Sequence, residues 1–321
     1  MSAASAPSCT ASSLGAGEPP IGTAPHATAW LCLEQDGPWG RTAFTTSHLD
    51  ADLGARIEER AGAAGVRPAL IRRPGHHADL PRGGRQLILA STHPERMWML
   101  SARITDPEVV LEIDMDALAG GDLPGTHASL PALAPDAEPV LLVCTNGARD
   151  VCCARLGRPV AVAAAEARPD RVWEATHTSG HRFAPTAVCL PSGYLHGRVL
   201  DASILLDDAD AGRLTLTGLR GRSTWPPGGQ VAEDAVRHEV TDADAAALVV
   251  EPDGEDHWLV RHRDGRLWSV AVTGFTEGES LDSCGKSPTP VLRWRVAAPV
   301  LVTRSGGLAD ESTGTSPIAE A

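Results

Sequence analysis

The chain has 321 residues, more than the roughly 250 to 300 at which a single hydrophobic core usually stops growing, so its length predicts two domains. The net charge of −13 and the isoelectric point of about 5.3 argue against a partner that is nucleic acid or an anionic membrane surface. The sequence has neither a secretory signal nor the ~18 successive apolar residues of a membrane span, and its seven cysteines are irregularly spaced, so we expect a cytoplasmic protein with reduced thiols.

The first part of the chain begins with a stretch that has little to bury. Residues 1–27 are rich in Ala, Ser, Gly and Pro, which predicts a disordered arm in which Cys9 is incidental. The apolar run 29–33 predicts the first strand. Over 48–57 apolar residues recur every four positions, which indicates an amphipathic helix with Ser47 as its cap.

Four further strand candidates complete the first part, at 69–71, 86–90, 98–100 and 109–113. Strands mixed with a helix in this order predict an α/β or α+β domain. The next segment, 126–138, contains two prolines and stops before a third, so we expect it to be a linker.

The second part of the chain alternates strands and helix in a recognisable order. The predicted elements are a strand at 139–144, a helix through 154–167 capped by Asp150 and interrupted at Gly157 and Pro159, and strands at 171–176, 186–190 and 194–199. A helix flanked by strands, with antiparallel strands behind them, is a thioredoxin-like order. The sequence therefore predicts an α/β (α+β) protein whose second domain is thioredoxin-like, with a mixed sheet flanked by helices.

The remaining residues predict a helix at 230–237, a hairpin around Asp264-Gly265 and a strand within 291–302. No internal repeat is visible in the sequence. The predicted divisions are a disordered arm 1–27, an α/β domain 28–125, a linker 126–138, a thioredoxin-like domain 139–245, a C-terminal β extension 246–303 and a disordered tail 304–321.

Five soft metal ligands lie close together in the second part: Cys144, Cys152, Cys153, His177 and His181. Cys144 ends one predicted strand and His177 ends another, so neighbouring strands would bring thiols and imidazoles to one rim of the sheet. Adjacent residues point in different directions, so only one of Cys152 and Cys153 is expected to join the others. A Cys₂His₂ set suits either structural zinc or a [2Fe–2S] cluster, and the ligand types leave both open.

Four motifs carry a family resemblance: V-C-T-N-G-A-R-D-V-C-C-A-R-L-G, W-E-A-T-H-T-S-G-H-R-F-A-P-T, C-L-P-S-G-Y-L-H-G-R and W-P-P-G-G-Q-V-A-E-D-A-V-R. Together with W-L-C-L-E-Q-D-G-P-W-G-R in the first part, they resemble the sucrase/ferredoxin-like family over most of 29–300. The resemblance implies a thioredoxin-like ferredoxin domain with a [2Fe–2S] cluster bound by Cys144, Cys153, His177 and His181. This chain departs from the family pattern by having Ser179 where a glycine is usual and Cys152 beside Cys153, which makes Cys152 the runner-up ligand.

The function that this resemblance implies is electron transfer with a redox protein partner, either a reductase or an electron acceptor. Proton uptake by a histidine ligand would couple electron and proton transfer. Structural zinc in an adaptor protein is the first alternative, and a thiol oxidoreductase is the second, although the chain has no C-x-x-C motif. No pair of carboxylates marks a sugar site, so sucrase activity is not supported. Cys189 and His196 are expected to be packing residues, and Cys284 has no assigned role.

Overall fold

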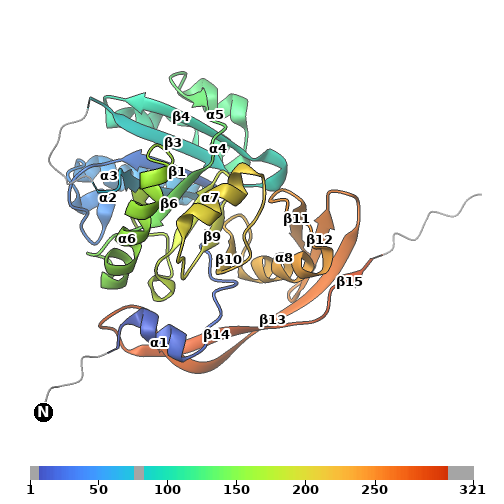
Figure 1. The fold of residues 1–321 in the computed structure, drawn as a ribbon. Coiled ribbons are helices and arrows are strands. Elements are labelled where there is room, and N and C mark those ends of the chain that lie inside the picture. The colour runs from blue at the N-terminus through green and yellow to red at the C-terminus, as the bar shows by residue number, and fades with distance from the viewer. Residues whose placement is uncertain (1–6, 76–82, 303–321) are drawn as a thin grey trace, which may run out of the picture.

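The computed structural model describes residues 7–75 and 83–302, and these form two sheets with helices packed against them (Figure 1). Within the described ranges, β1 to β10 form a ten-stranded mixed sheet and β11 to β15 a five-stranded antiparallel sheet. The fold is thus α+β, which confirms the predicted class. The predicted tail 304–321 lies outside the described residues.

The elements before residue 136 are α1 (Cys9–Gly15), β1 (Ala29–Glu34), α2 (Ala43–Thr46), α3 (Ala51–Ala63), β2 (Val66–Arg72), β3 (Arg85–Ser91), η1 (Pro94–Arg96), β4 (Trp98–Ile104), η2 (Pro107–Glu112), α4 (Met115–Gly120), α5 (Leu123–Ser129) and β5 (Ala134–Pro135). The later elements are β6 (Val140–Cys144), α6 (Val151–Ala167), β7 (Val172–Ala175), η3 (His181–Phe183), β8 (Ala187–Leu190), β9 (Tyr194–His196), α7 (Ala202–Asp210), β10 (Leu219–Arg222), α8 (Pro227–Val240), β11 (Leu248–Pro252), β12 (His257–His262), β13 (Leu267–Leu281), β14 (Pro288–Val296) and β15 (Val300–Leu301).

Two local predictions in the first part are wrong, and capping explains both. The helix predicted at 48–57 is α3, but it starts at Ala51 because the Asp50 carboxylate, rather than Ser47, accepts from the Leu53 amide at 2.9 Å. The strand predicted at 109–113 is instead the 3₁₀ helix η2. Pro107 suits the first position of a helix, and Asp106 caps it through the Glu108 amide.

The ten-stranded sheet contains the same arrangement twice. In β1–α3–β2–β3–β4, the first two strands are parallel, the third pairs antiparallel with the first, and the fourth pairs antiparallel with the third. The series β6–α6–β7–β8–β9 repeats these pairings. The thioredoxin-like order predicted for the second part is therefore present in both parts, although the sequence shows no repeat.

The two parts join edge to edge where β2 pairs antiparallel with β7, and Ile71 of β2 lies opposite Ala175 of β7. They also share a core, because Trp30 and Ile88 of the first part belong to the same buried cluster as Leu142 and Trp173 of the second. The predicted linker 126–138 contains the end of α5 and the short strand β5, which pairs with β4. The domain boundaries remain a prediction, since one sheet runs through both parts.

The described portion of the predicted disordered arm includes a helix. Helix α1 contains the fully buried Cys9 and Ser13 and lies against β13 and η3. The Ser12 hydroxyl accepts from the Leu281 amide at 3.0 Å, and the Glu18 carboxylate accepts from the Ser280 hydroxyl at 2.9 Å. The small residues that suggested disorder allow α1 to pack closely on β13. Cys9 is therefore part of the packed structure and not incidental.

The C-terminal elements bring distant segments to the second part of the main sheet. Helix α8 packs on the five-stranded sheet, where its buried residues Val231 and Val236 share a cluster with Val250 of β11 and Val270 of β13. The predicted hairpin around Asp264-Gly265 is present, with Gly265 at a positive φ of 93°. Strand β13 then runs towards α1 (Figure 1), and the turn after it brings Cys284 to the start of α6. No helix in the described part of the chain is long and apolar enough to cross a membrane.

Candidate metal centre

Two of the predicted ligands come from the junction of β6 and α6. Cys144 is the last residue of the buried strand β6, and Cys153 is the third residue of α6. Asp150 caps this helix as predicted, since its carboxylate accepts from the Cys152 amide at 2.9 Å. Gly157 lets the helix approach the strand, because a Cβ there would lie 2.3 Å from the Cys144 carbonyl oxygen. Both thiols are 1% exposed.

The two predicted histidine ligands lie in the loop after β7, as the sequence indicated. Ser179 and Gly180 both have a φ of 65°, in the left-handed region, and this turn stacks the rings of His177 and His181 with their centroids 4.6 Å apart. The buried Arg220 holds the turn: its guanidinium donates to the Ser179 carbonyl at 3.2 Å and to the Ser179 hydroxyl at 2.9 Å.

The fold brings these four residues together. Strands β6 and β7 are parallel neighbours, with Cys144 opposite Ala175, so the two loops meet at one rim of the sheet. The Cys153 Sγ lies 3.8 Å from His181 Nδ1, and the Cys144 and Cys153 thiols lie near enough to each other to shift each other's pKa. The thiols thus form one pair and the imidazoles another, with Cys153 and His181 in contact between them.

The surroundings favour one ionised thiol and two neutral imidazoles. The hydrogen bond with Cys153, together with those from Thr178 and Asn146, outweighs burial and lowers the pKa of Cys144 to about 6. The same bond and burial raise the pKa of Cys153 above that of a free thiol. Burial, followed by the charges of His181 and Arg67, lowers the pKa of His177 to about 3. Neutral imidazole and thiolate are the forms that bind metals.

The runner-up ligand Cys152 belongs to a different group. Its Sγ lies 3.4 Å from that of Cys284, and Cys9 and Asp150 complete the group. The ligand atoms of these four residues all lie within 4.8 Å of one another, so the group could hold a metal ion, and it contains no histidine. No local pattern predicts this group, because Cys9 and Cys284 are 275 residues apart and each stands alone in the sequence.

Basic residues surround the histidine loop. A cavity of about 250 Å³ beside His181 is lined by four cationic side chains, those of Arg41, Arg149, Arg182 and Lys286, and by one carboxylate, Asp282. That carboxylate is paired with Arg182 at 2.5 Å. The opening next to the predicted ligands is therefore positively charged although the whole chain carries a charge of −13.

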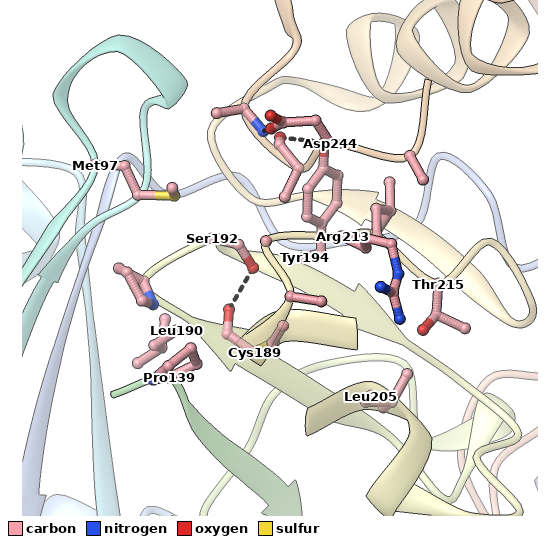
Figure 2. Close-up of a pocket in the computed structure, with 18 of the residues that line it drawn as sticks. Met97, Pro139, Cys189, Leu190, Ser192, Tyr194, Leu205, Arg213, Thr215 and Asp244 are labelled. Atoms are coloured by element: carbon pink, nitrogen blue, oxygen red, sulfur yellow. Dashed lines mark hydrogen bonds between the residues drawn. The ribbon is translucent and has the colours of Figure 1, made fainter. Parts of the chain in front are cut away.

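A second cavity, of about 510 Å³, lies elsewhere and contains none of the predicted ligands (Figure 2). Tyr194, Leu205 and Asp244 line it, with Cys189, whose carbonyl accepts from the Ser192 hydroxyl at 3.1 Å. The Cys189 side chain is part of a buried apolar cluster, and burial raises its pKa to about 12. It is therefore a packing residue, as the sequence predicted.

Comparison with known proteins extends the sequence observations. No curated protein matches the chain, and no solved structure matches it. The model of one family, described as sucrase/ferredoxin-like, matches residues 20–205, which cover both thioredoxin-like parts and all four residues at the rim. Because the match covers more than half of the 321 residues, the chain belongs to the sucrase/ferredoxin-like family.

Proposed function

We propose that this protein is an electron carrier and that Cys144, Cys153, His177 and His181 bind a [2Fe–2S] cluster. The observation that carries the proposal is the arrangement of these side chains as a pair of neighbouring thiols and a stacked pair of imidazoles, with Cys153 in contact with His181. Two thiolates on one iron and two histidines on the other are the ligand set of a histidine-ligated cluster. A single ion would instead favour four ligand atoms that all converge on one point.

The residues present fit such a group. The Nδ1 atom of His177 is buried and has no hydrogen-bond partner among the described residues, which is unusual for a polar atom and suits a metal ligand. Thr178 and the Asn146 amide lie near enough to the Cys144 sulfur to lower the pKa of that thiol. Donors of this kind stabilise a thiolate and tune the potential of a bound cluster.

The chain contributes position and shielding. Arg67 donates to the His177 carbonyl at 2.9 Å, and Arg220 fixes the turn that follows, so both imidazoles are held in place. When bound, the cluster would supply one-electron transfer at a potential above that of an all-cysteine cluster. His181 is only 7% exposed, yet it borders the basic cavity, where an electron could leave over a short distance.

The basic rim also indicates the kind of partner. Arg41, Arg149 and Lys286 line the same cavity as His181, and opposite charges guide encounters between redox proteins. We propose that the partner presents an acidic surface here. The overall negative charge of the chain would repel such an acidic partner from the rest of the molecule and so favour docking at the basic cavity.

The experiment is metal and sulfide analysis of protein purified without oxygen, with EPR of the reduced state. The proposal predicts two irons and two acid-labile sulfides per chain and nitrogen couplings from histidine in pulsed EPR. His177→Ala should lose or alter the cluster, whereas the control His238→Ala, on an exposed side chain of α8, should not. A colourless protein with zinc at these four residues and no sulfide would contradict the proposal and support the adaptor alternative.

A further inference from the structure

Three cysteines from distant parts of the chain converge on the first turn of α6. Cys284 Sγ lies 3.4 Å from Cys152 Sγ and 3.5 Å from Cys9 Sγ. Both carboxylate oxygens of Asp150 lie 3.6 Å from Cys9 Sγ. The electron-transfer site proposed above uses none of these four residues, and we propose that they form a second, mononuclear metal site of the structural-zinc class.

The spacing of the sulfurs fits one ion. With zinc–sulfur bonds of about 2.3 Å in a tetrahedral site, two sulfurs lie about 3.8 Å apart. The observed separations of 3.4 and 3.5 Å reach that value with shifts of a few tenths of an ångström. Three sulfurs and one carboxylate oxygen within 4.8 Å of one another supply the four ligands of such a site.

The carboxylate is already oriented for this role. Asp150 Oδ2 accepts from the Cys284 amide and the Ser283 hydroxyl, both at 2.8 Å, whereas Oδ1 accepts from the Cys152 amide at 2.9 Å. Oδ1 thus keeps a lone pair on the side of Cys9. Asp150 is 4% exposed and is fixed by the same backbone segments that carry two of the thiols, which is how outer hydrogen bonds orient metal ligands.

The thiols have donors that stabilise the charge they acquire on binding. The amide of Cys9 donates to the Cys284 sulfur at 3.3 Å, and the Thr10 amide lies near enough to the Cys152 sulfur to lower the pKa of that thiol. Binding a divalent ion would release three thiol protons and leave two negative charges on the site, with no change of oxidation state. These N–H···S bonds offset part of that charge.

A disulfide is the competing use of these thiols. It would join Cys284 to one neighbour and release two electrons and two protons to an oxidant. The third thiol would then be left out, and the Asp150 carboxylate would keep only its role as the cap of α6. The metal site uses all four groups and needs no oxidant. It also explains why the start of α1 and the turn after β13, which are far apart in sequence, both contact Asp150 at the start of α6.

The test measures zinc, iron and sulfide in the full chain purified without oxygen or chelators. We expect one zinc per chain in addition to the iron, and we expect Cys9→Ser and Cys284→Ser to lose the zinc while retaining iron and sulfide. The control Cys32→Ser alters a cysteine that is also fully buried but lies within β1, and it should retain both metals. Zinc content unchanged in both variants would overturn the assignment.

Cobalt binding separates the second site from the first. Metal-free protein carrying Cys144→Ser and His177→Ala should still bind one Co²⁺, with thiolate charge-transfer absorption that falls by about a third when Cys284→Ser is added. This measurement does not depend on the metal that a variant acquires in cells, because Co²⁺ is titrated into the purified Cys144→Ser, His177→Ala protein with and without Cys284→Ser. No cobalt binding by that parent, or a disulfide at Cys284 in anaerobically alkylated protein, would refute the site.

Discussion

Adjacent cysteines have separate environments at the start of α6. Cys153 contacts His181 and Cys144, whereas Cys152 contacts Cys284. Successive residues of a helix point about 100° apart, so the neighbours cannot serve one small group together. Their sequence adjacency suggested a single site with a choice of ligand, but the structure divides them between two groups.

Ser179 occupies a position that normally favours glycine, and its side chain explains why serine is tolerated. The left-handed φ of 65° costs a residue with a Cβ about 1 kcal/mol or more. In return, the Ser179 hydroxyl accepts from Arg220, whose guanidinium is fully buried. The serine that replaces the usual glycine of the family pattern is therefore stabilised in this chain by its hydrogen bond with Arg220.

Replacing Ser179 should separate these two effects. Ser179→Ala keeps the strain and loses a hydrogen bond to a buried cation, so we expect unfolding free energy to fall by about 2 kcal/mol. Ser179→Gly loses the same bond but relieves the strain, so it should cost about 1 kcal/mol less. Urea denaturation of both variants measures the difference. Equal stability of the two variants would show that the left-handed turn carries no strain.

His196 provides a pH dependence that is independent of the metal centre. It is 3% exposed, and burial lowers its pKa to about 4 despite the hydrogen bond to the Thr215 carbonyl and the charge of Asp208, while Arg220 lowers it further. Because the folded pKa lies below the unfolded value of about 6.5, the unfolded chain binds this proton first as pH falls. The stability that neutral His196 provides is complete above pH 6.5 and is lost between 6.5 and 4.

The variant His196→Gln should remove this share of the acid sensitivity. Each pH unit in that window is worth about 1.4 kcal/mol, so between pH 6.5 and 5 the wild-type protein should lose about 2 kcal/mol more than the variant. Urea denaturation of both proteins at several pH values checks this. Parallel profiles for the two proteins would mean that His196 is protonated in the folded state as easily as in the unfolded chain.

At the scale of elements, the contact between α6 and β6 determines where Cys153 lies relative to Cys144. At Gly157 the helix backbone lies too close to the strand to leave room for a Cβ. In the sequence this glycine reads as an interruption of the helix, as does Pro159. In the structure α6 runs unbroken from Val151 to Ala167. A glycine required by tertiary packing and a glycine that weakens a helix look alike in a sequence.

The substitution Gly157→Ala should therefore destabilise the protein and disturb the metal centre. Its Cβ would lie 2.3 Å from the Cys144 carbonyl oxygen, so helix and strand would have to separate, at a cost of about 1 to 3 kcal/mol. The control is Gly62→Ala in α3, where a Cβ meets nothing within 4 Å, and which should be neutral or stabilising by up to about 1 kcal/mol. Thermal unfolding and iron content check both. Similar behaviour of the two variants would rule out the close approach.

The strands were easier to predict than the helix starts and the short helices. Runs such as 29–33 and 139–144 are continuous and apolar because both faces of the central strands are buried, and each matches β1 or β6 closely. The start of α3 depends on Asp50, which competes with the nearby Ser47 as the cap. The formation of η2 depends on Asp106, whose capping competes with the strand propensity of the residues that follow. Helix α1 depends on contacts with β13, which no local pattern reveals.

At the scale of the whole molecule, two similar thioredoxin-like parts share one sheet, but only the second carries the four proposed ligands. Superposition of the strand order places Glu34 of β1 where Cys144 ends β6. The repeat was not predictable because the two parts share strand order and pairing rather than residues. The proposed ligand positions follow from the resemblance, whereas the Cys9, Asp150, Cys152 and Cys284 group depends on long-range packing alone.

The joint between the two parts should be important for stability. Arg72 of β2 forms bonds of 2.8 and 2.6 Å with Glu174 of β7, which also accepts from the Thr145 hydroxyl beside Cys144. Glu174→Ala leaves a mostly buried cation without its carboxylate, so we expect a loss of about 2 to 3 kcal/mol. The control Asp207→Ala breaks an exposed pair with Arg168 and should cost less than about 1 kcal/mol. Equal losses in urea denaturation would contradict a supporting role for the joint.

The central claim, that Cys144, Cys153, His177 and His181 bind a [2Fe–2S] cluster, is tested most directly by the neighbouring cysteines. The measurement is reduced-state EPR with iron quantification on Cys153→Ser and Cys152→Ser, both purified without oxygen. We predict that Cys153→Ser loses the cluster signal or shifts its g values, whereas Cys152→Ser keeps two irons and the wild-type spectrum. Loss of the signal in Cys152→Ser with an unchanged Cys153→Ser would contradict the account.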